Sequence, residues 1–246
     1  MKTTEQSTAP RIVSREEWTT ARQKFLAKEK EFTRLRDQLS QERRELPWVK
    51  IGKDYTFESA DGKRSLADLF EGRGQLIVYH FMFGPGWEEG CRGCSYVADH
   101  FDGCLPHLHA RDVTLAVVST APLAEFLPFR SRMGWEFPWL SCAGNTFNRD
   151  YHVSWMPEEV ADGKKVYYNY GFREASMEEL PGLSVFARGK DGEIFHTYST
   201  YSRGLDILLG TYNLIDLVPK GRNEGGLEMP MNWVRHHDRY ETAESR

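Results

Sequence analysis

The sequence predicts an α/β fold with a mixed central sheet, preceded by a long helical arm. Two near-continuous apolar runs, 75–83 and 112–120, are typical of strands that are covered on both faces. A helical pattern follows each run, and a later hairpin pattern surrounds Asp191 and Gly192. The order is therefore β-α-β-α and then β-β-α. This order predicts parallel first strands, helices on both faces and an antiparallel hairpin.

The N-terminal segment has the pattern of one long helix, over about 15–45. Ser14 and Glu17 have the spacing of a capping box, and no Gly or Pro follows until Pro47. Apolar residues recur every seven positions, at Trp18, Phe25, Phe32, Leu39 and Leu46. We expect this stripe to dock on the parent domain or on a second subunit, so a homodimer through the helix is one expected assembly.

Patterning divides the chain into an arm over 1–46, an α/β domain over 47–225 and a tail over 226–246. An aromatic-rich insertion is expected at about 140–180, and the "RHHDR" of the tail is expected to be a solvated surface. Pro106 should bend or restart the helix that begins near the cysteines. One closing helix is expected over "SRGLDILLGTYNLIDLV".

Composition excludes several functional classes. The 246 residues include 32 Lys and Arg against 36 Asp and Glu, a net charge of −4. This lacks the basic excess of a nucleic-acid-binding protein. No apolar run approaches the roughly 18 residues of a membrane span, and the N-terminus lacks the apolar core of a secretory signal. We therefore expect a cytoplasmic protein with no nucleic-acid or membrane partner.

The chemistry is concentrated in a CxxC pair, Cys91 and Cys94, where a predicted strand passes into a predicted helix. A helix N-terminus stabilises the thiolate, which is the reactive form of cysteine. A second thiol in the same turn can attack a mixed disulfide on the first. The pattern predicts dithiol–disulfide exchange, with Cys91 as nucleophile and Cys94 as resolving thiol.

Several motifs resemble the DUF899 family, thioredoxin-like bacterial proteins described as predicted dithiol–disulfide oxidoreductases. They are "FMFGPGWEEGCRGCS", "RMGWEFPW", "GLSVFARGKDGEIFHTYSTYSRGLDILLGTY" and "DLVPKGR". The resemblance covers nearly the whole chain. It implies a thioredoxin-like three-layer sandwich with a mixed central sheet. We expect no cofactor and no resident metal. The expected partners are a protein or small-molecule disulfide or thiol substrate and an external thiol reductant.

The approach to the first cysteine departs from the thioredoxin pattern. Thioredoxins carry Trp directly before this cysteine, whereas Trp87 stands four residues before Cys91. Glu88 and Glu89 would raise the pKa of the Cys91 thiol if they came close, and Arg92 would lower it. Arg92, Glu88 and Glu89 are therefore the expected pKa modulators, and Trp87, with Pro181 and Leu183, is expected to belong to a substrate-facing loop.

Two further thioredoxin elements have uncertain counterparts here. The proline that faces the thioredoxin active site aligns with Leu183, and Pro181 lies two residues earlier. Either the loop is shifted and the Leu180–Pro181 bond is cis, or the element is missing. His80 lies near the position of the buried acid that relays protons in thioredoxin. It is a candidate proton acceptor, although a hydrogen-bonded core histidine is the favoured alternative.

Alternative functions remain open. Zinc could be held by the cysteine pair and two of His100, His107 and His109, but a histidine six residues along one helix cannot easily turn back to its N-terminus. A peroxidase is less expected, because Pro85 stands six residues before the first cysteine with no hydroxyl between them. A non-catalytic, redox-responsive module is the main competitor.

The remaining cysteines, Cys104 and Cys142, are single in the sequence. We expect both to be buried as small apolar residues.

Overall fold

A computed structural model describes residues 10–175 and 177–241. The chain forms two compact units, Met1–Pro47 and Trp48–Arg246. The first contains helix α1, Arg15–Arg44, and the predicted capping box is present. The Glu17 N–H donates to the Ser14 hydroxyl over 3.2 Å, and the Ser14 N–H donates to the Glu17 carboxylate over 3.1 Å.

The apolar stripe of α1 is exposed. Within Arg15–Arg44 no residue is buried, and between 50% and 67% of each of Trp18, Phe25, Phe32, Leu35 and Leu39 is accessible to solvent. A helix of this kind usually covers its apolar face against another surface. A homodimer through this helix stays a prediction.

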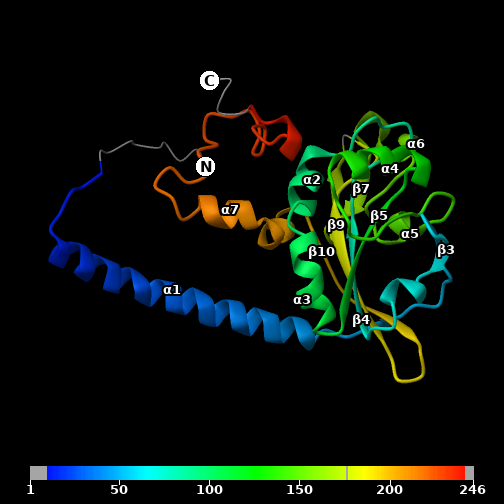
Figure 1. Ribbon diagram of the computed structural model, residues 1–246, viewed down its shortest axis with the longest axis horizontal. Helices are drawn as coiled ribbons and strands as arrows, with labels where there is room; N and C mark the ends of the chain where they lie inside the picture. Colours follow the sequence, from blue (N-terminus) through cyan, green and yellow to red (C-terminus); the bar gives the residue numbers. More distant parts are fainter. Residues whose placement is uncertain (1–9, 176, 242–246) are drawn as a thin grey trace. The chain divides into compact units, whose positions relative to one another are not determined.

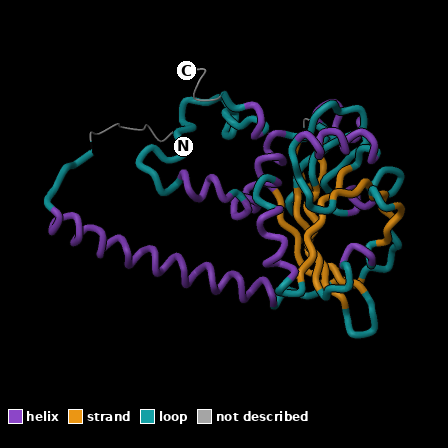
Figure 2. The backbone as a smooth tube through the Cα atoms, in the orientation of Figure 1, coloured by secondary structure: helices purple, strands orange, loops and turns teal. Residues whose placement is uncertain are grey.

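The second unit is built on an eight-stranded mixed sheet with the order β1-β10-β9-β4-β5-β6-β2-β3 (Figures 1 and 2). Its strands are β1 Val49–Lys50, β2 Thr56–Ser59, β3 Gly62–Ser65, β4 Gln75–His80, β5 Val113–Ser119, β6 Trp139–Ser141, β9 Gly182–Arg188 and β10 Ile194–Tyr201. Strands β4, β5 and β6 are parallel, and the other neighbouring pairs are antiparallel. Parallel strands with a helical crossover beside an antiparallel hairpin form the thioredoxin arrangement, so the predicted fold class is confirmed.

The longer crossover helices lie on one face of this sheet. The helices are α2 Arg92–Ala98, α3 Leu105–His109, α4 Leu123–Arg132, α5 Phe147–Asp150, α6 Pro157–Val160 and α7 Gly210–Ile215. The two parallel crossovers advance in the same direction, and right-handed connections then place α2, α3 and α4 together. Their side chains form one core with Tyr79 and Phe81 of the β4 segment. A second core, around Phe147 and Phe186, fills the opposite face.

Smaller elements complete the unit. They are the hairpin β7 Lys165–Tyr168 with β8 Gly171–Glu174 and the 3-10 turns η1 Asp68–Phe70, η2 Asp102–Cys104, η3 Ala161–Gly163, η4 Ser202–Leu208 and η5 His237–Arg239. The segment predicted as an insertion supplies strand β6 and the core residue Phe147. Among the described helices, none is both long and apolar enough to cross a membrane.

The predicted single closing helix is wrong, because a tertiary contact divides it. Helix α7 follows η4 only after Leu209, whose φ of −88° and ψ of 77° are not helical. The Thr211 N–H donates to Nε2 of His100 over 3.0 Å, and a Cβ at Gly210 would lie 2.8 Å from the same ring. His100 therefore satisfies a free N–H at the start of a new helix. The restart at Pro106 is confirmed, because this proline lies in the first turn of α3.

A buried carboxyl group anchors the loop that leads into β9. Glu179 is 4% exposed. Its Oε1 accepts hydrogen bonds from the Thr120 and Ser154 hydroxyls, each over 2.8 Å. Burial raises the pKa of Glu179 to about 7. The side chain is therefore largely neutral in the folded protein below that pH.

The raised pKa of Glu179 predicts a pH-dependent stability. The unfolded chain loses this proton near pH 4.5 and the folded chain near pH 7. The free energy of unfolding should therefore fall across this interval by about 3 kcal/mol. Glu179→Gln keeps the accepting oxygen and removes the titration. Urea denaturation should find the variant equal to the wild type near pH 4 and more stable above pH 7.

Glu174→Gln is the matched control, because Glu174 lies exposed on β8. It should follow the wild-type pH profile. Equal pH slopes for the wild type and Glu179→Gln would mean that the buried carboxyl group is already ionised in the folded state.

Candidate functional site

The cysteine pair lies where β4 passes into α2, as the sequence predicted. Cys91 is the N-cap residue of α2, and both thiols are free. The backbone of Met82 holds both residues. Its carbonyl accepts the Cys91 N–H over 3.1 Å, and its N–H donates to the Cys94 sulfur over 3.5 Å. The strand end therefore fixes the position of both residues.

The surroundings of Cys91 favour its thiolate. A hydrogen bond from the Cys94 thiol, aided by the backbone N–H groups of Cys94 and Gly93 and the charge of Arg92, lowers the pKa of Cys91 to about 6. Burial acts in the opposite direction but is outweighed. Because Cys91 is only partly buried, the thiolate is accessible near neutral pH. Accessible thiolates of this kind are the reactive cysteines of proteins.

Cys94 has the opposite character. It is 1% exposed, and burial raises the pKa of its thiol well above the usual value, with the hydrogen bond and charge of Cys91 adding to the effect. Hydrogen bonds from Tyr79 and the Met82 N–H partly offset this rise. Cys94 therefore keeps its proton and donates it in a hydrogen bond to Cys91. The pKa values of the two thiols are therefore shifted in opposite directions.

Tyr79 is a residue of the site that the sequence reasoning missed. It lies on β4, is 1% exposed, and its side chain is hydrogen-bonded to Cys94. Burial, with the neighbouring Cys94, raises the pKa of Tyr79 well above its usual value, so its hydroxyl stays protonated as a donor. The available signal was the strand period of two, which places Tyr79 and His80 on opposite faces. It does not show which face carries the cysteines.

The proposed proton-accepting role of His80 does not match its position. Nδ1 lies 2.9 Å from the Asn148 side-chain oxygen and Nε2 lies 2.9 Å from the Ser184 hydroxyl. The ring packs beside Phe147 and Tyr151 in the core on the other face of the sheet. Burial lowers the pKa of His80 to about 4. The favoured alternative, a hydrogen-bonded core histidine, describes it.

The three charged residues that were predicted to modulate the pKa of Cys91, namely Glu88, Glu89 and Arg92, have different surroundings. Arg92 is exposed beside Cys91, and its charge helps to lower the pKa of that thiol. Glu89 forms ion pairs with Arg132 and Arg239, and the hydrogen bond from Arg132 holds the pKa of its carboxyl group below the usual value. Glu88 is exposed. The guanidinium groups therefore balance the acid that would otherwise oppose a thiolate.

The C-terminal segment supports the cysteine loop. His236 is 3% exposed; Nε2 donates to the Gly90 carbonyl over 2.9 Å, and Nδ1 accepts from Arg132 over 2.9 Å. A Cβ at Gly90 would lie 2.6 Å from the Phe81 ring, so only glycine fits directly before Cys91. The expectation that "RHHDR" is entirely a solvated surface is wrong, because this histidine is buried against the loop.

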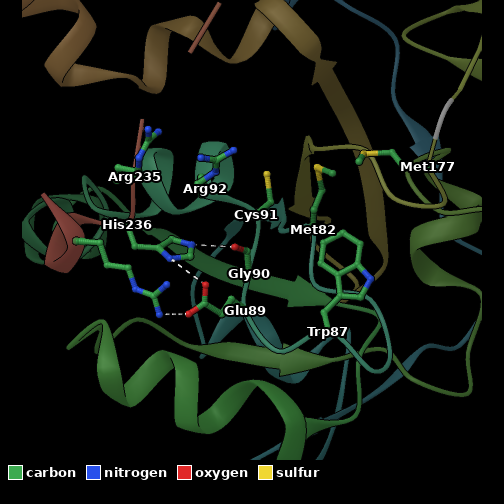
Figure 3. Close-up of a pocket in the computed structure, with 10 residues that line it drawn as sticks. Met82, Trp87, Glu89, Gly90, Cys91, Arg92, Met177, Arg235 and His236 are labelled. Atoms are coloured by element: carbon green, nitrogen blue, oxygen red, sulfur yellow. Dashed lines mark hydrogen bonds and ion pairs between the residues drawn. The ribbon is translucent and has the colours of Figure 1, made fainter. Parts of the chain in front are cut away.

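A pocket of about 550 Å³ opens beside Cys91 (Figure 3). It is lined by Met82, Trp87, Glu89, Gly90, Cys91, Arg92, Met177, Arg235, His236 and Arg239. Trp87 therefore lines this pocket, although it stands four residues before Cys91. The volume lies within the usual range for small-molecule sites. The thiolate can be reached by a substrate from this side.

The cis-proline that faces the active site in thioredoxins has no counterpart here, because the described residues contain no cis peptide bond. The Leu180–Pro181 bond is trans, and the Pro181 carbonyl accepts a hydrogen bond from Tyr168 over 2.7 Å. Leu183 is buried in β9, paired in register with Tyr79. Of the two alternatives, the shifted loop with a cis Leu180–Pro181 bond is therefore not the one formed.

The histidines of the zinc alternative are not gathered at the cysteines. Among the described residues, no three His, Cys, Asp or Glu side chains form a metal-binding group. His100 instead bonds to Thr211.

The two single cysteines differ. Cys142 is buried, and burial raises the pKa of its thiol to about 12. Cys104 is exposed, so the expectation that it is buried is wrong. It belongs to η2, a 3-10 turn whose residues are not buried.

Three solved structures are similar to this chain at low identity. Peroxidoxin BcpB from Mycobacterium tuberculosis is 18% identical with a TM-score of 0.45, covering 69% of this chain and 97% of that chain. A mutant of PrxQ from Xylella fastidiosa is 13% identical with a TM-score of 0.44, covering 68% and 94%. A Chlorobium tepidum protein described as a DsbE thiol:disulfide interchange protein is 12% identical with a TM-score of 0.40, covering 69% and 97%. These likenesses are too distant to carry an inference about activity.

A family comparison is more informative. No curated protein matches the chain. The sequence model of a family described as "Bacterial protein of unknown function (DUF899)" matches residues 7–240. The match spans nearly the whole sequence and confirms the family expected from the motifs. The chain therefore belongs to the DUF899 family of bacterial proteins.

Proposed function

We propose that this protein is a thiol–disulfide oxidoreductase. The observation that carries the proposal is the contrast within the pair. Cys91 has a pKa lowered to about 6 and lines a pocket, whereas the pKa of the buried Cys94 is raised. A nucleophile must be ionised and accessible, and a resolving thiol must wait until the mixed disulfide forms.

The proposed reaction has two steps. The Cys91 thiolate attacks one sulfur of a substrate disulfide, forms a mixed disulfide and releases the first thiolate. Cys94 then gives its proton to that thiolate or to water and attacks the Cys91 sulfur. The second thiolate leaves, and two electrons have passed from the pair to the substrate. An external thiol reductant restores the pair. We place this cycle in the cytoplasm, where a reducing environment would supply such thiols.

The first prediction concerns the roles of the two cysteines. Cys91→Ser should reduce insulin disulfide reduction to the uncatalysed rate, because the attacking thiolate is gone. Cys94→Ser should accumulate a mixed disulfide on Cys91, detected by intact-mass spectrometry. If wild type and Cys91→Ser reduce disulfides equally slowly, the non-catalytic alternative is favoured. Hydrogen peroxide consumption by wild type alone would favour a peroxidase.

The lowered pKa of Cys91 predicts the pH profile of its alkylation. In a Cys104→Ser background, which removes the exposed second thiol, iodoacetamide should modify Cys91 with a midpoint near pH 6. Peptide mass spectrometry after timed quenching measures the rate. Cys94→Ala should move the midpoint upward, because the first cause of the lowered pKa is the Cys94 hydrogen bond, which an alanine cannot donate. A wild-type midpoint above pH 8 would contradict the proposed thiolate.

Tyr79→Phe should separate the two steps. The hydroxyl bonds to Cys94 and lowers the pKa of that thiol, so its loss should slow release of the second thiolate about tenfold. The rate of Cys91 attack should change little. Stopped-flow measurement with a chromogenic disulfide resolves both steps. Tyr151→Phe, on the opposite face of the sheet, is the control and should leave both steps unchanged. Equal slowing of both steps would contradict the assigned contact.

A further inference from the structure

We propose that the pocket beside Cys91 selects small disulfides that carry carboxylates. This inference rests on the proposed function and names its substrate class. Figure 3 shows Arg92 and Arg235 on one side of the Cys91 sulfur, with Met82 and Met177 on the other. The pocket thus combines an apolar wall, a reactive sulfur and cationic groups.

The charges in the pocket favour an anion. Of the pocket arginines, Arg239 pairs with Glu89. Neither Arg92 nor Arg235 forms an ion pair with an acid of the described chain. Arg235 is instead held by the backbone, donating from Nη1 to the Asn232 carbonyl over 2.8 Å and to the Val234 carbonyl over 3.1 Å. Two guanidinium groups without acid partners can therefore receive ligand carboxylates, for which their geometry is suited.

The apolar part of the pocket suits the chain that joins a disulfide to its carboxylates. Met82 is buried, and Trp87 is partly buried. Together with Met177 they line the side of the pocket away from the arginines. Thioether and indole groups pack well against methylene and sulfur atoms. The volume of about 550 Å³ is large enough for a small disulfide.

The chemical step is the exchange already described. The Cys91 thiolate bonds to one sulfur of a dicarboxylate disulfide, and the carboxyalkyl thiolate on the other sulfur leaves. Cys94 then displaces the second carboxyalkyl thiolate. The substrate gains two electrons, and an external dithiol returns the protein pair to its reduced form. The arginines bind the substrate and take no part in electron transfer.

A matched series of disulfides tests the selectivity. Dithiodipropionate, hydroxyethyl disulfide and cystamine share one spacer and carry two negative charges, no charge and two positive charges. Mass spectrometry measures mixed-disulfide formation on Cys91 in a Cys94→Ser, Cys104→Ser background, with each rate divided by that of free mercaptoethanol. The normalised rate for dithiodipropionate should exceed that for hydroxyethyl disulfide about tenfold, and cystamine should be slowest. Equal normalised rates, or a preference for cystamine, would overturn the inference.

Two variants locate the effect. Arg235→Gln should remove most of the preference for dithiodipropionate over hydroxyethyl disulfide. Arg235→Lys should restore part of the preference, because charge without the planar fork still attracts an anion. Lys190→Gln makes the same charge change in the exposed β9–β10 turn and should have no effect. Loss of preference in Lys190→Gln as well would contradict a local site.

Binding without chemistry separates this inference from the proposed function. Suberate is an unreactive isostere of dithiodipropionate, and hexanediol is the neutral counterpart. In Cys91→Ser, suberate should shift the Trp87 indole NMR signal and bind about tenfold more tightly than hexanediol. Suberate binding with no wild-type exchange of any disulfide would refute the proposed function and retain the anion site. Exchange without charge preference, and no suberate binding, would retain the function and refute the site.

Discussion

The backbone of one residue, Met82, holds the two cysteines in place. Met82 accepts a hydrogen bond from the backbone of Cys91 and donates one to the sulfur of Cys94. Met82 lies two residues after the end of β4, and β4 is paired with a strand on each side. The cysteines therefore take their positions from the centre of the sheet. Cys91 lies at a helix start beside a pocket, and the pKa of its thiol is lowered. Cys94 lies in the core, and the pKa of its thiol is raised.

The C-terminal segment supplies a second constraint on the loop. His236 bonds to the carbonyl of Gly90, and Arg132 connects that histidine to Glu89. The acid in the loop is thus neutralised by a guanidinium group before it can oppose the thiolate. The charge near Cys91 depends in part on these pairings, which join three segments far apart in the chain. The fold gives the loop geometry, and the Cys94 hydrogen bond, the backbone N–H groups and Arg92 lower the pKa of the Cys91 thiol.

Much of this architecture follows from local patterns in the sequence. The apolar runs give β4 and β5, Pro106 gives the restart at α3, and the change of period locates the cysteines at a helix start. These features depend on neighbouring residues, so the sequence contains their cause. The fold class follows from the order of such elements.

Other features depend on partners that a local pattern cannot identify. A period of two places Tyr79 and His80 on opposite faces but does not say which face meets Cys94. The predicted closing helix has good helical periodicity. It is nevertheless interrupted where the Thr211 N–H bonds to His100, a residue from a distant part of the chain. His236 looks like a solvated polar residue until the fold brings it to Gly90. In each case a tertiary hydrogen bond outweighs a local preference.

The contact between His236 and Gly90 also has a consequence for synthesis of the chain. These partners are 146 positions apart, so the ribosome must add that length after the cysteine loop has been made. At ordinary elongation rates this takes roughly 7 to 30 s. During that time the CxxC segment of the nascent chain lacks the C-terminal segment that later contacts it through His236. The contact of His236 with Gly90 can therefore form only well after the cysteine loop has been synthesised.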